Sequence, residues 1–147
     1  MSDEQGYRVP EVCRIVGITY RQLDYWARTG LVNPSVQEAG GSGTQRLYSF
    51  EDLVQLRVIK RLLDAGISLQ SIRQAIGYLR DRLKQAPHGM TLMSDGKSIY
   101  ALESADEIID LLQRGQGVFG IAIDKVWTDV EGSLKEAGRA VAKAGGA

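Results

Sequence analysis

The side chains that most often carry catalysis are scarce in this sequence. Cys13 and His88 are its only cysteine and histidine, so neither an internal disulfide nor a cluster of metal-binding thiolates can form. We expect Cys13 to be structural and His88 to be solvated. Asp106, Glu107 and Asp110 lie at the start and on the exposed face of a predicted helix, where acidic groups complement the helix dipole. The sequence therefore predicts no enzyme, no metal site and no cofactor.

Arginine and tyrosine side chains gather instead between residues 20 and 48. Arginine can donate two hydrogen bonds to guanine, whereas tyrosine can contact a thymine methyl group or a phosphate. On a helix that begins near residue 19, Tyr20 and Arg21 would face solvent in the first turn, which is the part of a helix that meets base edges. This pattern indicates DNA recognition. The candidate contacts are Thr19, Tyr20, Arg21, Tyr25, Arg28, Thr44, Arg46 and Tyr48.

Contacts to phosphate would fix the register of the protein on DNA and provide much of its salt-dependent affinity. Four candidates are assigned this role: Tyr25, Arg28, Arg46 and Tyr48. Thr44 or Gln45 would donate to a phosphate from a loop tip. Arg28 could instead be a cation that complements the dipole at a helix end, and Tyr25 an ordinary surface residue. Trp26, on the opposite face, is predicted to lie in the core.

Two short helices must position the candidate residues. Pro10 suits the first turn of a helix, apolar residues follow at helical spacing, and Gly17 can end that helix. Thr19 can cap a second helix that runs to about residue 29, where Gly30 stops it. Two such helices joined by a tight turn are typical of a helix-turn-helix.

The segment after the second helix is predicted to form a wing. Residues 33–46 are rich in glycine, serine and proline, which excludes a helix. Val36 and residues 46–48 could pair as a short hairpin across this segment. Ser49 then begins a capping box for a third helix, and Ser68 caps a fourth. The fourth helix carries a heptad-like stripe of Ile72, Ile76, Leu79 and Leu83.

After a predicted linker at residues 85–90, the spacing of apolar residues changes from a helical to a strand-like pattern. Residues 91–93 and 98–102 are predicted strands around an Asp-Gly turn signal, followed by a helix capped at Ser104, a strand at residues 118–123 and a last helix. We expect a DNA-binding domain at residues 1–84, a small α+β module for dimerisation or sensing at residues 91–137, and a frayed tail at residues 138–147. The predicted fold is mostly α with small β. Four apolar residues are either plain core or the lining of a ligand pocket: Met90, Met93, Tyr100 and Phe119.

Composition supports this division of roles. Residues 1–84 hold 12 Lys/Arg and 9 Asp/Glu, whereas residues 85–147 hold 6 and 9. The first half is therefore basic and the second acidic, although the net charge is zero. The acidic start is unlike a signal peptide, and no apolar run approaches the roughly 20 residues that span a bilayer. We expect a cytoplasmic protein with no membrane partner.

Residues 17–31 read GITYRQLDYWARTGL and resemble the second helix of the MerR family, which typically reads GVSxRTLRYYExxGL. The residues of the wing end (RLY at 46–48), EDL at 51–53 and AGISLxxIR at 65–73 follow in the order of that family. The resemblance covers about residues 7–83. It implies a winged helix-turn-helix in which Arg21 takes the place of the family's DNA-contacting arginine.

Three features depart from the family pattern. Asp24 stands where arginine is common, and Gln45 where a wing tyrosine is common. We expect Asp24 to pair with Arg21 or Arg28, or to accept from the amino group of cytosine. The long helix through which MerR relatives dimerise is replaced after Pro87 by a predicted hairpin. The dimer surface would then be the stripe of the fourth helix, the strand at residues 118–123 or the last helix, unless the last helix covers the sheet of its own chain.

The resemblance implies a transcription regulator that binds double-stranded promoter DNA as a homodimer and bends and untwists it. RNA polymerase is a further candidate partner, and the sequence names no effector. Two alternatives stay open. One is a DNA-architectural protein similar to a phage excisionase. The other is a helix-turn-helix module that binds a protein such as a sigma factor instead of DNA.

Overall fold

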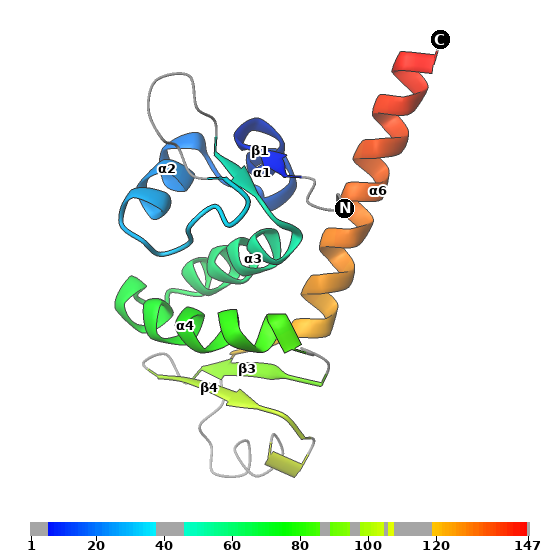
Figure 1. The fold of residues 1–147 in the computed structure, drawn as a ribbon. Coiled ribbons are helices and arrows are strands. Elements are labelled where there is room, and N and C mark those ends of the chain that lie inside the picture. Colours follow the sequence, from blue (N-terminus) through cyan, green and yellow to red (C-terminus); the bar gives the residue numbers. More distant parts are fainter. Residues whose placement is uncertain are drawn as a thin grey trace.

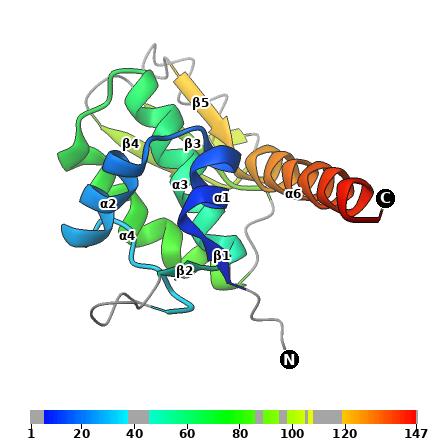
Figure 2. The same ribbon diagram turned by 90° about the horizontal axis from the view of Figure 1, so that it is seen from above.

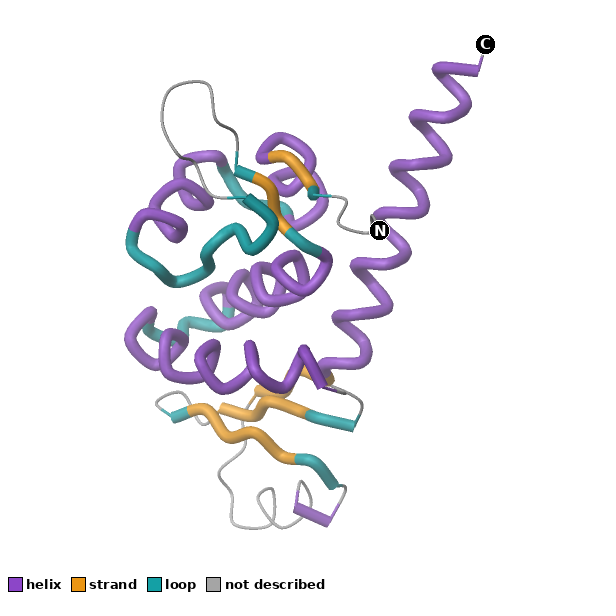
Figure 3. Tube along the Cα trace, in the orientation of Figure 1, coloured by secondary structure: helices purple, strands orange, loops and turns teal. Residues whose placement is uncertain are grey.

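The computed structural model describes residues 6–37, 46–85, 89–94, 98–104, 106–107 and 119–146. Helices form most of this part of the chain, beside two small antiparallel sheets (Figures 1 and 3). The predicted fold class is therefore confirmed at this level. In chain order the elements are β1 (Tyr7–Arg8), α1 (Val9–Val16), α2 (Tyr20–Arg28), β2 (Leu47–Tyr48), α3 (Phe50–Asp64), α4 (Leu69–Gln85), β3 (Thr91–Ser94), β4 (Ile99–Leu102), β5 (Phe119–Ala122) and α6 (Ile123–Gly146).

The first two helices form as the sequence predicts. Pro10 lies in the first turn of α1, and Gly17 ends the helix with a positive φ of 84° while its N–H donates to the Cys13 carbonyl. Thr19 caps α2 in a reciprocal capping box with Gln22: the Gln22 N–H donates to Thr19 Oγ1 over 3.0 Å. Both helix ends that face the turn are thus capped by hydrogen bonds.

Strand β2 pairs on both sides with segments that precede it. The predicted pairing with the segment near Val36 is present, because Leu47 N–H donates to the Gln37 carbonyl over 2.8 Å and the Leu47 carbonyl accepts from Val36 and Gln37. An unpredicted strand, β1, pairs with β2 in antiparallel register, with Tyr7 opposite Tyr48. This second partner decides which face of β2 turns into the core.

Helix α3 lies at the centre of the molecule and is buried along most of its length. It packs on α1 and α4. Arg57 reaches back from α3 and donates through Nη2 to the Ile15 carbonyl over 2.7 Å, which satisfies an otherwise unpaired group near the end of α1. Burial lowers the pKa of this guanidinium, with the nearby charge of Arg61 acting in the same direction.

The heptad-like stripe of α4 is used within its own chain. Ile72, Ile76 and Leu79 are buried, and α4 lies between α3 and the three-stranded sheet (Figure 1). The side chain of Leu83 lies outside the described residues. The expectation that this stripe forms the dimer surface is therefore corrected: two neighbouring elements of the same chain already cover it.

The sheet of the second half has the strand order β4-β3-β5, all antiparallel. The three predicted strands are thus present. Of the helix predicted after Ser104, only residues 106–107 lie within the described part of the chain and are helical. Met90 and Leu92 belong to the same buried cluster as the core of the first half. The two halves therefore share one hydrophobic core, and residue 90 of the expected linker is part of it.

The sequence left open that the last helix covers the sheet of its own chain, but α6 does not cover it. It leaves β5 and runs beside α3 and α1 (Figures 1 and 2). The rings of Trp127 and Phe50 meet edge to face at 4.6 Å, and Arg61 Nη2 lies 3.0 Å from Asp129 Oδ2. Although burial opposes ionisation of Asp129, hydrogen bonds from Lys125 and Arg61 hold its pKa below the ordinary value. Both contacts fix α6 to α3.

Helix α6 continues to Gly146, beyond the point where a frayed tail was expected. Its last turns extend away from the rest of the described chain (Figure 2). Alanine recurs through this stretch and is the strongest helix former, which explains why the helix continues despite its glycines. Within the described residues, no helix is long and apolar enough to cross a membrane.

Candidate nucleic-acid interface

Helix α2 presents a polar and aromatic face to solvent and an apolar face to the core. Leu23 and Trp26 are buried, as predicted for Trp26. On the outer face, Tyr20 is 62% exposed and Tyr25 is 47% exposed. Arg21 is exposed as well, on the first turn of the helix. Two exposed tyrosines on one short helix form a surface suited to a partner, because tyrosine combines an apolar ring with a hydroxyl that can form hydrogen bonds.

Asp24 joins the outer face of α2 to strand β2. Its carboxylate accepts from Arg46 Nη1 over 2.8 Å and from Arg28 Nε over 2.9 Å. The predicted pairing with Arg28 is therefore present, and Arg46 is an additional partner 22 residues further along the chain. The hydrogen bond from Arg46 and then that from Arg28 lower the pKa of Asp24. The same bond from Asp24 raises the pKa of Arg46.

Its two arginine partners give the charge of Asp24 a structural role. An isolated carboxylate on the outer face would repel phosphate, but Asp24 is shared between two guanidinium groups, so the cluster of three side chains carries a net positive charge. Arg28 remains largely exposed, whereas only 18% of the Arg46 side chain is exposed. Arg28 thus remains available to a partner, and Arg46 chiefly holds β2 against α2.

Arg21 is free of such restraints. It forms no ion pair with any residue in the described part of the chain, and the predicted alternative of pairing with Asp24 is not realised. A solvent-facing guanidinium without an intramolecular partner retains all its donors for a ligand. Of the candidates on α2, Arg21 therefore has the most hydrogen-bonding capacity to offer.

Two other predicted contacts are placed differently by the structure. Tyr48 is fully buried, with no exposed surface, because its pairing opposite Tyr7 in the β1–β2 sheet turns the ring into the core. We therefore correct its role from phosphate contact to core residue. Thr19 is exposed, but its hydroxyl oxygen is occupied as the cap of α2. Thr44 and Gln45 lie outside the described residues.

Two arginines of α4 donate hydrogen bonds to the chain just after α2, a role that was not predicted from the sequence. Arg73 Nη1 donates to the Thr29 carbonyl and Arg80 Nη2 to the Leu31 carbonyl, each over 3.2 Å. These carbonyls follow the last turn of α2, where helix ends leave acceptors unsatisfied. The spacing of the two arginines, seven residues apart on one helix, places them on one face and is a signal that could have revealed the pair.

The remaining candidates for chemistry stay structural. Cys13 is partly buried on α1, and burial raises the pKa of its thiol, which disfavours the reactive thiolate. Within the described residues, no group of three or more His, Cys, Asp or Glu side chains is arranged to hold a metal ion.

Two short helices joined by a three-residue turn, with arginine and tyrosine exposed on the second, define a helix-turn-helix protein. A family model described as "MerR HTH family regulatory protein" matches residues 7–79. Through these residues the chain belongs to the MerR family. The match includes β1, both helices of the turn, β2, α3 and most of α4.

Relatives named as transcription regulators agree with this assignment. An uncharacterized HTH-type transcriptional regulator of Mycobacterium tuberculosis is 56% identical over 131 residues, which cover 89% of this chain and 58% of the relative. The HTH-type transcriptional regulator HmrR of Sinorhizobium medicae is 29% identical over 68% of this chain and 60% of its own length. Heavy metal-dependent transcription regulator 2 of Rhizobium meliloti is 26% identical over the same shares. The chain thus spans less than two thirds of each of these relatives.

Proposed function

We propose that this chain is a sequence-specific DNA-binding transcription regulator in which α2 enters the major groove. The observation that carries the proposal is the unpaired, solvent-facing Arg21 on the first turn of a helix whose opposite face is anchored in the core. Such a helix fits the major groove, and its first-turn side chains meet base edges. Tyr20, beside Arg21, would contact a thymine methyl group or a phosphate.

The connection between Gln37 and β2 would act as the wing of a winged helix-turn-helix. Support comes from the pairing of Leu47 with Gln37, which closes the base of this connection, and from the Asp24–Arg46 bond, which ties that base to α2. Thr44, which lies outside the described residues, would donate to a phosphate of the DNA backbone. Arg28 and Tyr25 would contact phosphates next to the groove.

The functional unit would be a homodimer on two-fold-symmetric promoter DNA, bent and untwisted by the protein. Bending a site of this kind costs about 1–6 kcal/mol, which one short helix in one groove would scarcely repay. Because α4 buries its stripe internally, the surfaces left for dimerisation are the edge strands β4 and β5 and the projecting part of α6. RNA polymerase would be a further partner.

Binding of the full chain to its own upstream DNA tests the proposal, measured by fluorescence anisotropy across a salt series. We expect tight, site-specific binding that weakens steeply with salt, because contacts to phosphate release counterions. Arg21→Ala should weaken specific binding by about 5- to 150-fold, the equivalent of about 1–3 kcal/mol for a lost bidentate base contact, and should reduce binding to unrelated DNA much less.

Lys125→Ala is a charge-matched control, because Lys125 is 69% exposed near the start of α6, away from the projecting part of that helix, and the variant loses the same single positive charge. It should bind almost as the wild type does. Absence of binding by a folded wild-type chain, or equal losses in both variants, would overturn the assignment of Arg21 and would favour a module that binds a protein partner.

A further inference from the structure

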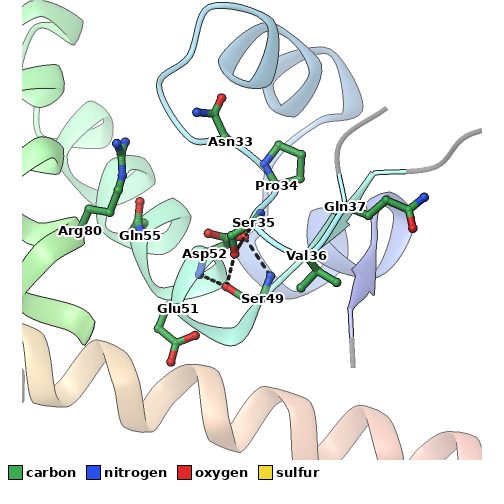
Figure 4. Close-up of a pocket in the computed structure, with 10 residues that line it drawn as sticks. All are labelled: Asn33, Pro34, Ser35, Val36, Gln37, Ser49, Glu51, Asp52, Gln55 and Arg80. Atoms are coloured by element: carbon green, nitrogen blue, oxygen red, sulfur yellow. Dashed lines mark hydrogen bonds between the residues drawn. The ribbon is translucent and has the colours of Figure 1, made fainter. Parts of the chain in front are cut away.

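Helix α4 borders one pocket toward α3 and another toward the sheet. The first, of about 420 Å³, lies between the segment that follows α2, the start of α3 and Arg80 (Figure 4). The Asp52 carboxylate in its wall already accepts from the Ser35 N–H and from Ser35 Oγ, each over 2.8 Å. The other charged side chains that line it, Glu51 and Arg80, point apart in Figure 4. This pocket therefore offers no convergent set of groups to a ligand.

The second pocket, of about 530 Å³, lies between α4 and β4, where Figure 1 shows α4 beside the sheet. Its volume falls within the range of about 300–1,000 Å³ that is usual for small-molecule sites. The residues of α4 that line it recur at helical spacing and so share one face of the helix: Ser71, Gln74, Ala75 and Tyr78. The sheet side contributes Leu92, Ser98, Ile99 and Ala101. The residues considered from the sequence as a pocket lining do not border it: Met90, Met93, Tyr100 and Phe119.

None of the residues that line this second pocket carries a charge. An ion that leaves water needs an opposite charge or several hydrogen bonds in exchange, because it loses its hydration. The Glu103 carboxylate, just after β4, is not among the lining residues and accepts a hydrogen bond from the Tyr78 hydroxyl over 3.3 Å. The lining therefore favours a neutral ligand.

One wall of the pocket is apolar and is built from small side chains. Leu92 is only 2% exposed and belongs to the core that the two halves share. Ala101 stands opposite Leu92 in the pairing of β3 with β4, and Ala75 faces the same space from α4. Two alanines leave open a volume that larger apolar side chains would fill. An apolar group that enters it extends the hydrophobic core and leaves water, which is favourable.

Tyr78 indicates which apolar group fits. Its side chain lines the pocket, yet the residue is 47% exposed, so part of its ring remains in water. The hydrogen bond from its hydroxyl to Glu103 restrains the far end of the ring, while α4 fixes the near end. Aromatic rings pair favourably, edge to face or offset and stacked. Gln74, exposed on the same face of α4, provides an amide that can both donate and accept.

We propose that the pocket between α4 and β4 binds a small neutral aromatic molecule of one or two rings that carries a hydrogen-bonding group. The ring packs against Leu92 and the two alanines and pairs with Tyr78, and its polar group bonds to the Gln74 amide. A carboxylate or an ammonium group on the same ring weakens binding, because the pocket offers no charge to compensate it.

Helix α4 joins this pocket to α2. Arg73 and Arg80 each lie within two residues of a lining position on α4, and they donate to the carbonyls of Thr29 and Leu31 that follow α2. A ligand that moves α4 relative to the sheet therefore also shifts the contacts that hold the end of α2. We expect the ligand to change DNA affinity, a step that rests on the proposed function, whereas ligand binding itself does not.

Calorimetric titration of the full chain without DNA tests the proposal, together with the change in melting temperature. The probes are benzamide, naphthalene-2-carboxamide and indole-3-acetamide, each beside the carboxylate of the same shape. We expect at least one amide to bind and its carboxylate to bind about tenfold or more weakly. Failure of every amide to bind at millimolar concentration would overturn the site, and equal binding within each pair would overturn the class of ligand.

Two matched pairs of variants locate the ligand. Ala101→Val fills the pocket and should weaken binding by about tenfold or more, whereas Ala122→Val makes the same change at an exposed position of β5 that does not line it. Tyr78→Ala should likewise weaken binding, whereas Tyr25→Ala removes an equally exposed ring on α2 and should not.

The two pairs protect each other against misfolding. If Ala101→Val proved too crowded to fold, Tyr78→Ala would still decide, because a half-exposed ring can be removed without emptying the core. Equal binding by the folded variants of both pairs would place the ligand elsewhere and overturn the site.

The last measurement separates regulation from binding. The anisotropy titration with DNA is repeated with and without the amide that binds. A change in DNA affinity in the wild type that is lost in Tyr78→Ala supports the coupling. Unchanged DNA affinity overturns the coupling alone, and an absence of DNA binding concerns the proposed function and leaves the ligand result standing.

Discussion

At the scale of single residues, the exposed face of α2 depends on how its charges are shared. Arg21 is free, whereas Asp24 is held by two guanidinium groups. This difference suggests two roles for the arginines. Arg21 is kept for the partner, whereas Arg28 and Arg46 bind the Asp24 carboxylate, which would otherwise repel DNA. Asp24 then acts as a positioning residue that fixes β2 relative to α2, and its own contact with a base is not required.

The charge of Asp24 should make a measurable, pH-dependent contribution to stability. Its folded pKa is lowered below the ordinary value of 3.8, so its stabilising effect is present above that pH and is lost as the pH falls through the folded pKa. We expect Asp24→Asn to lower the free energy of unfolding at about pH 7, and the difference from the wild type to shrink toward about pH 3. Urea unfolding of both proteins between about pH 3 and about pH 7 measures this difference in the free energy of unfolding.

Asp64→Asn provides the comparison, because Asp64 forms a more exposed pair with the single partner Lys60. Such a surface pair contributes little, so this variant should differ less from the wild type at neutral pH. A loss for Asp24→Asn that stayed the same from neutral to acidic pH would show that the charge of Asp24 is not what stabilises the fold.

At the scale of elements, caps decide where the short helices begin. Helix α2 has only nine residues and is too short to be stable by itself. Its start depends on the capping box between Thr19 and Gln22, and its end on the contacts from α4. The geometry of the interface is thus maintained by polar contacts at the two ends of α2 and by two buried side chains along it.

Removal of the cap should therefore weaken the fold. We expect Thr19→Ala to lower the free energy of unfolding by about 1 kcal/mol, because the Gln22 N–H loses its acceptor. Thr19→Ser keeps the hydroxyl and should lie close to the wild type. Urea denaturation followed by circular dichroism gives both values. If serine and alanine had equal effects, the hydroxyl of Thr19 would not be the cap that matters.

At the scale of the whole molecule, the two halves of the chain share one buried cluster. Helix α4 contacts α3 on one side and the sheet on the other, and α6 returns from the sheet to α1 and α3. The last helix, α6, therefore packs against the first helix, α1. We expect one cooperative unfolding transition and no separate melting of the first half of the chain.

The two tryptophans allow a direct test of this cooperativity, because Trp26 lies on α2 and Trp127 on α6. In each variant that retains one of them, the fluorescence of that tryptophan and the circular dichroism signal should give the same urea midpoint. Ile76→Ala should lower the free energy of unfolding by about 2–5 kcal/mol as reported by either tryptophan, because Ile76 is buried at the centre of this core.

Gln74→Ala, at an exposed position on the same helix, should change stability by less than about 0.5 kcal/mol. Two separate midpoints, or an effect of Ile76→Ala seen by only one tryptophan, would show that the halves fold independently.

Short stretches of sequence are enough to specify those parts of this protein that depend on near neighbours. The helices α1 and α2 with their caps, the three strands of the second half and the buried position of Trp26 all follow from periodicity and from residues three or four apart. The same local patterns carried the family resemblance, because a helix-turn-helix is itself a local motif. The pairing of Asp24 with Arg28 was predictable for the same reason, since the two are one helical turn apart.

Which surfaces of these elements meet depends instead on contacts between residues far apart in the chain. Tyr48 turns inward because β2 pairs with a strand some 40 residues earlier, and Arg46 reaches Asp24 across a loop. The α4 stripe could have served a second copy of the chain, but α3 and the sheet cover it first. An apolar face does not by itself determine which partner it packs against, since the hydrophobic effect is non-directional. Which face covers which is decided when the whole chain packs.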